Sequence, residues 1–188
     1  IVAASEDGNT LVYTDAVTGR IGFVDITDPA APTALGAVDT GVDTGGDPTS
    51  VTVAGPTVFA VVNTGTFTEP TGTLLTIDLA SREITGEVAL AGQPDSVAIS
   101  PDGTFLAVVI ENERDEDLND GLIPQLPAGL VQVFAIADGA LAGDPVDVEL
   151  TGIADVAPDD PEPEFVDIND DNVAVVSLQE NNWLALVD

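Results

Sequence analysis

Residues 93–112, with the sequence QPDSVAISPDGTFLAVVIEN, indicate the fold of this chain. Apolar residues alternate at Val97 and Ile99, and a run rich in β-forming residues covers positions 105–110. Between them lies the segment Ser-Pro-Asp-Gly at 100–103, in which Pro and Gly favour a tight turn. The stretch is therefore predicted to form two β-strands joined by this turn.

Variants of this unit occur four times. Segments 1–8, 47–53 and 163–172 align with parts of it, and an ungapped alignment places Glu180-Asn181 on Glu111-Asn112. Third strands are predicted at 21–26, 74–79, 130–136 and 183–188, and fourth strands at 37–41, 87–92 and 148–152. Four short strands per unit, about 46 residues apart between the second and third units, are typical of β-propeller blades.

We therefore predict an all-β fold, a β-propeller of four-stranded antiparallel blades that forms one domain over residues 1–188. The predicted blades cover approximately residues 1–46, 47–92, 93–157 and 158–188. A β-sandwich is the alternative, but it would not need such regular repeats.

The repeat makes up about three and three-quarter blades. Because propellers close on themselves to hide their strand edges, we expect part of a larger propeller. The remaining blades would come from the same precursor or from a second chain, with self-association through exposed blade edges as a further possibility. A closed four-bladed propeller is the alternative.

The composition excludes several classes of partner. The net charge is −31, from 34 acidic residues against three Arg and no Lys, so the surface repels nucleic acid and anionic membranes. Such a charge suits a salt-rich medium and predicts a halophilic or marine source. The absence of Cys and His removes disulfides, thiolate chemistry and the usual general base. The longest apolar run, 105–110, is too short for membrane insertion.

Propeller geometry brings three acidic features to one face, because the link between strands two and three emerges on the same face as the link between blades. These features are the insertion at 113–121, the segment 155–164 that leads into the fourth blade, and the repeated Glu-Asn pair. Asp95 is expected near the central channel. The candidate residues outside the predicted metal site are Asp95, Glu111, Asn112, Glu113, Arg114, Glu162, Glu180 and Asn181.

Carboxylates and amides without Lys are ligands of a hard cation, Ca²⁺ before Mg²⁺. The predicted metal site consists of Asp115, Asp117, Asn119, Asp120 and Glu164. An EF-hand is rejected, because Leu126 stands where the bidentate Glu should be and no helices flank the loop. A solvated acidic loop is the alternative to calcium binding.

Three of the candidates have two interpretations. Glu111 and Glu180 are either a paired acid and base or strand-end residues that hydrogen-bond to neighbouring loops. Arg114 either clamps a phosphate or carboxylate or pairs with its acidic neighbours.

The chain resembles the secreted bacterial propellers of the choice-of-anchor I family. The resemblance rests on the motif at 94–103, the acidic insertion after Glu111-Asn112, and the strings EPEF at 162–165 and LQENN at 178–182. Members of this family are often labelled alkaline-phosphatase-like, and they are similar to esterase-like phytase and YncE-like propellers. The resemblance implies an extracellular or cell-surface protein of about twice this length or more.

Two functions follow as hypotheses. The first is a binding or scaffold module that is stabilised by calcium. The second is a metal-dependent phosphoesterase of phytase-like type, in which Ca²⁺ ions on the acidic face polarise the phosphate and activate water. The scarcity of basic residues favours the binding module.

Overall fold

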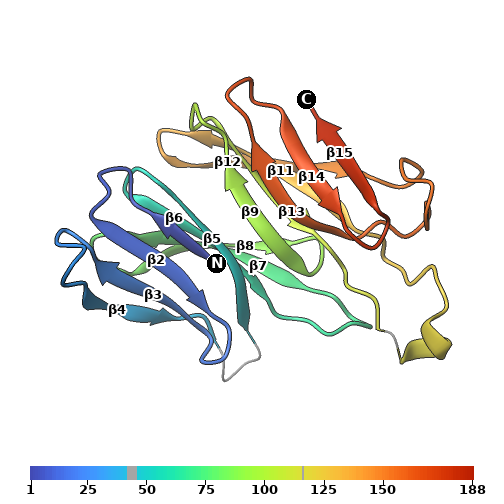
Figure 1. Ribbon diagram of the computed structural model, residues 1–188, viewed down its shortest axis with the longest axis horizontal. Helices are drawn as coiled ribbons and strands as arrows, with labels where there is room; N and C mark the ends of the chain where they lie inside the picture. Colours follow the sequence, from blue (N-terminus) through green and yellow to red (C-terminus); the bar gives the residue numbers. More distant parts are fainter. Residues whose placement is uncertain (42–45, 116) are drawn as a thin grey trace.

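The computed structural model describes residues 1–41, 46–115 and 117–188, so Glu116 of the predicted insertion lies outside the described residues. Four antiparallel sheets follow one another along the chain, and each has its strands in sequence order. In Figure 1 the sheets lie side by side from the blue N-terminal strands to the red C-terminal strands. The predicted all-β architecture of propeller blades is confirmed, and the chain forms a partial propeller.

The first two blades have four strands each. Blade one consists of β1 (Val2–Ala4), β2 (Thr10–Asp15), β3 (Arg20–Asp25) and β4 (Thr33–Asp39). Blade two consists of β5 (Asp47–Ala54), β6 (Thr57–Asn63), β7 (Gly72–Asp78) and β8 (Ile84–Leu90).

The third blade also has four strands, and the fourth blade has three. Blade three consists of β9 (Pro94–Ile99), β10 (Phe105–Ile110), β11 (Leu130–Ala137) and β12 (Ala140–Glu149), with the short 3₁₀ turn η2 (Leu118–Gly121) between β10 and β11. Blade four consists of β13 (Pro163–Ile168), β14 (Ala174–Leu178) and β15 (Trp183–Val187).

The predicted turn between β9 and β10 is present, and hydrogen bonds of the Ser100 side chain add to the effect of its Gly. The Ser100 hydroxyl donates to the Asp102 carboxylate (2.8 Å) and accepts from the backbone N–H groups of Thr104 and Phe105 (3.1 Å each). Gly103 has a φ of 69°, which a residue without Cβ adopts at little cost. The link is therefore tight enough to pair the two strands directly.

Adjacent blades pack face to face through their apolar residues. Three clusters of buried side chains fill the interfaces between blades one and two, two and three, and three and four. A serine on each of two innermost strands also joins neighbouring blades. Ser50 accepts from the N–H of Val97 (3.3 Å), and Ser96 accepts from that of Val166 (3.4 Å). The blade interfaces thus fix the relative positions of the strands that begin each blade.

A β-bulge recurs at the start of the innermost strands. The register shifts between Pro48 and Ser50 in β5, between Pro94 and Ser96 in β9, and between Pro163 and Phe165 in β13. The extra residue in each case is Thr49, Asp95 or Glu164. Since a bulge leaves one residue outside the regular pairing and redirects its side chain, these three positions are equivalent.

Two details differ from the sequence-based expectations. The fourth strands β4, β8 and β12 begin earlier than predicted, because their largely exposed residues lack a clear apolar alternation. In addition, Ile168 pairs with Ala174, whereas the ungapped alignment would have required Val175. The link before β14 is one residue shorter than the link before β10, where Ile99 pairs with Leu106. A one-residue shift reverses the faces of the strand, so the ungapped alignment was wrong within β14.

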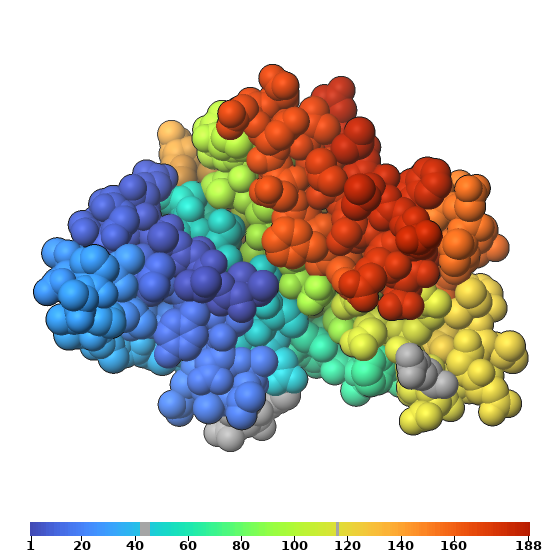
Figure 2. Space-filling model, in the orientation of Figure 1, coloured from blue at the N-terminus to red at the C-terminus, as the bar shows by residue number. Residues whose placement is uncertain are grey.

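Blades one and four each turn one apolar face to solvent. On blade four, Phe165, Leu184 and Leu186 are 54%, 65% and 73% exposed. On blade one, Val2 is 60% exposed and Tyr13 is 39% exposed. Figure 2 shows these two blades as the blue and red sectors at opposite sides of the molecule. The corresponding faces between the blades are buried, so the two outer faces have the character of blade interfaces.

Candidate functional site

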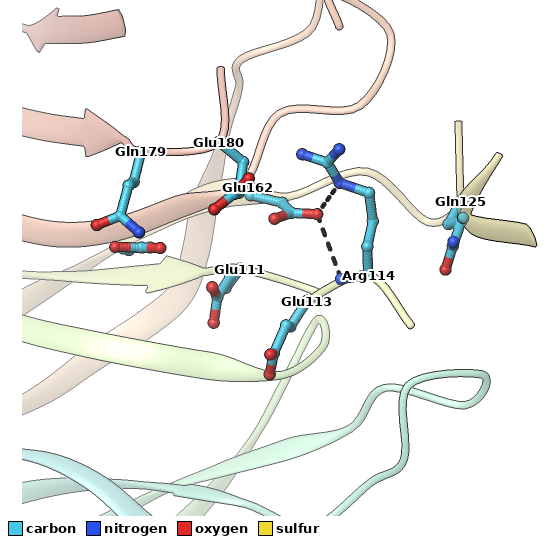
Figure 3. Close-up of a pocket in the computed structure, with 9 residues that line it drawn as sticks. Glu111, Glu113, Arg114, Gln125, Glu162, Gln179 and Glu180 are labelled. Carbon is cyan, nitrogen blue, oxygen red and sulfur yellow. Dashed lines mark hydrogen bonds and ion pairs between the residues drawn. The ribbon is translucent and has the colours of Figure 1, made fainter. Parts of the chain in front are cut away.

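An acidic pocket lies between blades three and four. It has a volume of about 400 Å³ and receives residues from the end of β10, from the β10–β11 link, from the start of β13 and from the end of β14 (Figure 3). We call this cavity the acidic pocket. The residues that line it are Glu111, Glu113, Arg114, Gly121, Gln125, Glu162, Glu164, Gln179 and Glu180. Five carboxylates therefore share one cavity with a single basic side chain.

Glu111 is a buried carboxylate of this pocket that, unlike Glu162, has no basic partner among the described residues. The residue is only 9% exposed, and none of the described residues donates a hydrogen bond to its carboxylate. The pKa of Glu111 is raised from 4.5 to about 8, and burial is the largest cause. Repulsion from nearby carboxylates adds to it, in decreasing order from Asp95, Glu113, Glu164 and Glu162. Near neutral pH this side chain binds a proton when nothing else balances its charge.

The bulge residues Asp95 and Glu164 lie next to Glu111 and belong to two different blades. Burial and the carboxylates of Glu164 and Glu113 raise the pKa of Asp95 to about 6. Burial, Glu180 and Glu113 also raise the pKa of Glu164. Asp95 does not line the cavity. It is close enough to the pocket carboxylates for their charges to raise its pKa.

Arg114 is held by two acidic residues that precede β13. Its Nε and its backbone N–H both donate to Oε1 of Glu162, and Nε lies 3.6 Å from Oδ2 of Asp160. Both acidic residues are buried, at 3% and 1% exposure. Burial raises the pKa of Glu162, and the bonded guanidinium opposes that rise. Arg114 therefore pairs with acidic residues, and this ion pair links the insertion to blade four.

Asn112 and Asn181 have equivalent structural roles. The side-chain oxygen of Asn112 accepts from the N–H of Gln93 (2.9 Å), and that of Asn181 accepts from the N–H of Glu162 (2.9 Å). The Asn181 amide also donates to three backbone carbonyl oxygens, among them that of Asp160 (3.0 Å). Each Asn therefore ties the end of the second strand to the segment that starts the same blade.

The predicted metal ligands of the acidic insertion, Asp115, Asp117, Asn119 and Asp120, do not line the acidic pocket. Asp115 accepts from the N–H of Asp117 (2.9 Å), while Asn119 and Asp120 are exposed, with left-handed φ values of 51° and 57°. Glu164 is thus the one residue of the predicted metal set that lines the acidic pocket.

The described carboxylates are not arranged around one metal position. Among residues 1–41, 46–115 and 117–188, no three acidic side chains are placed to coordinate one ion together. Calcium prefers six to eight oxygen ligands at about 2.3–2.6 Å, so the carboxylates would have to move or act through water molecules. Calcium binding stays a prediction.

Comparison with known families assigns the fold and the family. The family model for the choice-of-anchor I domain matches residues 1–188. The chain belongs to the choice-of-anchor I family. A comparison with curated protein sequences found no match for this choice-of-anchor I domain.

Solved structures resemble the choice-of-anchor I domain in fold. A chain of the mitotic checkpoint complex superposes with a TM-score of 0.66 at 12% identity, covering 98% of this chain and 48% of that one. A putative 6-phosphogluconolactonase from Bacteroides uniformis gives 0.56 at 18% identity, with 98% and 48% covered. Hydrazine synthase from Kuenenia stuttgartiensis gives 0.52 at 13% identity, with 100% and 63% covered. The domain therefore spans about half to two thirds of the length of these chains.

Several residues of the pocket of the choice-of-anchor I domain were not found by sequence reasoning. Gln125 bonds to Asp115 through its side chain and to Asp160 through its backbone N–H (3.0 Å). Gln179 lines the cavity beside Glu180. The LQENN string contained Gln179, but no pattern in the sequence distinguished Gln125, which follows the insertion in the β10–β11 link. Among the described residues, no helix is long and apolar enough to cross a bilayer.

Proposed function

We propose that this domain is a cation-binding module of an extracellular or cell-surface propeller, and that the acidic pocket is its binding site. The observation that carries this proposal is Glu111, a carboxylate nine-tenths buried and without a hydrogen-bond donor among the described residues. A buried carboxylate is costly unless it is protonated or paired with a positive charge. A bound cation would supply that charge, and the family name supports a location at the cell surface.

Calcium is the inorganic cation that the sequence predicts. Adding millimolar CaCl₂ at pH 7.5 and constant ionic strength is expected to raise the melting temperature by several degrees, because a cation that binds the folded state stabilises it by mass action. Differential scanning calorimetry measures this shift, and a chelator should reverse it.

The control is Glu83→Gln, which makes the same Glu-to-Gln substitution at an exposed carboxylate in the β7–β8 turn of blade two. Glu111→Gln should lose most of the calcium response, whereas Glu83→Gln should keep it. Equal responses in both variants would mean that calcium only screens the charge of −31.

The outer faces of blades one and four are proposed to receive further blades, from the same precursor or from a second chain. Their exposed apolar residues and the 48–63% coverage of the similar propeller chains support this. Closure hides strand edges and apolar faces together. The intact mass of the native protein tests it, because a propeller of this 188-residue chain alone would contradict the proposal.

A metal-dependent phosphoesterase is the second candidate. The observation that favours it is Nη2 of Arg114, which is buried and has no hydrogen-bond partner among the described residues. A guanidinium N–H would suit a phosphate oxygen, while bound metal ions would polarise the ester and activate water. Hydrolysis of p-nitrophenyl phosphate that chelator abolishes and that Glu164→Gln lowers would support the enzyme. If the protein does not hydrolyse p-nitrophenyl phosphate in the presence of calcium, the phosphoesterase function is excluded.

A further inference from the structure

The carboxylates of the acidic pocket are distributed along its walls. They come from four segments of two blades, and no three of them within the described ranges are placed around one ion position. A bare divalent ion needs several oxygens at one point, whereas separated carboxylates can each bind a separate positive group. The arrangement therefore favours a ligand with several positive charges at a distance from one another.

The pocket already contains one organic cation in its wall. The Arg114 guanidinium donates to Glu162 and lies beside Asp160, with its side chain only 17% exposed. This ion pair shows that the wall of the pocket accommodates a cationic group carried on an aliphatic chain. It also occupies Glu162 and so leaves Glu111, Glu164 and Glu180 without a basic partner among the described residues.

The size of the pocket also exceeds that of an ion. A volume of about 400 Å³ is within the range of pockets that bind small organic molecules, roughly 300–1,000 Å³. Its polar lining includes Gln179, whose amide oxygen can accept a hydrogen bond from an ammonium group. A flexible aliphatic chain with ammonium groups would fill this space.

We propose that the acidic pocket binds an aliphatic polyamine, with one ammonium group on Glu111 and the others on Glu164 and Glu180. This inference rests on the proposed cation-binding function and names its ligand class. Each contact is a charge-assisted hydrogen bond, with N···O distances of about 2.7–2.9 Å when formed.

The experiment is isothermal titration calorimetry of the 188-residue chain with spermidine, calcium and n-butylammonium at pH 7.5 and matched ionic strength. Spermidine is expected to bind saturably with one molecule per chain and about tenfold or more tightly than the monoamine, because it engages several carboxylates. Glu111→Gln should weaken spermidine binding by about tenfold or more, and Glu83→Gln should leave it unchanged. Circular dichroism of both variants checks that they fold.

The two levels of the proposal fail differently. If calcium binds and depends on Glu111 while spermidine binds weakly and equally in both variants, the polyamine inference is overturned and the cation-binding function stands. If neither cation depends on Glu111, both are overturned. Spermidine binding that is lost equally in Glu83→Gln would also overturn the inference, since it would report only the overall negative charge.

Discussion

Replacing Arg114 by alanine is expected to destabilise the folded chain by about 3–5 kcal/mol at pH 8, because it leaves Glu162 and Asp160 as buried carboxylates without their cation. Glu162 already has a raised pKa because of burial, and the guanidinium opposes that rise. Without Arg114 its pKa in the folded state would rise further. Equilibrium denaturation in urea measures the loss.

The pH dependence of this loss identifies its cause. At pH 5 the mutant can neutralise Glu162 by protonation, so the difference in unfolding free energy between wild type and Arg114→Ala should shrink. Adding Glu162→Gln to Arg114→Ala should restore part of the stability at pH 8. The control Arg20→Ala removes an exposed base from blade one and should change the stability by less than about 1 kcal/mol. A loss in Arg114→Ala that is the same at both pH values would contradict the ion-pair explanation.

Replacing Glu111 by glutamine is expected to stabilise the protein at pH 8.5 in the absence of added cations. The pKa of Glu111 is about 8 in the folded state and has an ordinary value of 4.5. Between these pH values the folded state binds a proton that the unfolded state has released, so wild-type stability falls as the pH rises from about 4.5 to 8. Glutamine stays neutral and avoids this loss, which is on the order of a few kcal/mol.

Thermal unfolding at pH 6 and 8.5, at constant ionic strength and with chelator, measures the effect. The melting temperature of the wild type should decrease more between these pH values than that of Glu111→Gln. The exposed control Glu83→Gln should behave as the wild type does. If Glu111→Gln is less stable than the wild type at pH 8.5, then Glu111 is paired in solution and the cation site proposed for it is absent.

The repeated strand pairs could be predicted because local signals agree with the fold. Alternating apolar residues and a turn with Pro and Gly both point to the β9–β10 pair, and that pattern recurs. The outer strands were placed less well, since β4 and β12 are mostly exposed and carry little periodicity. The ungapped alignment was wrong within β14 because a single deletion in a link is invisible when both ends of the repeat still align.

The residues that form the acidic pocket were largely named from the sequence, but their contacts were not. Topology indicated that the end of β10 and the start of β13 meet at one face. The bond between Arg114 and Glu162 spans 48 residues, and no local pattern encodes it. A usable signal did exist for the bulges, because Pro48, Pro94 and Pro163 each stand one residue before the bulged position. Proline lacks the N–H that a regular ladder would need.

The recurring bulge has a consequence for how such domains can diversify. Thr49, Asp95 and Glu164 occupy one site per blade where the side chain is outside the regular strand pairing. Substitutions there leave the regular strand pairing intact, although Thr49 also donates to the Pro94 carbonyl of the next blade (3.0 Å). If the proposed cation binding holds, ligand preference can change at these positions while the scaffold persists. A threonine in blade two and acids in blades three and four already illustrate this variation within one chain. Relatives with other ligands should therefore differ first at the residue after this proline.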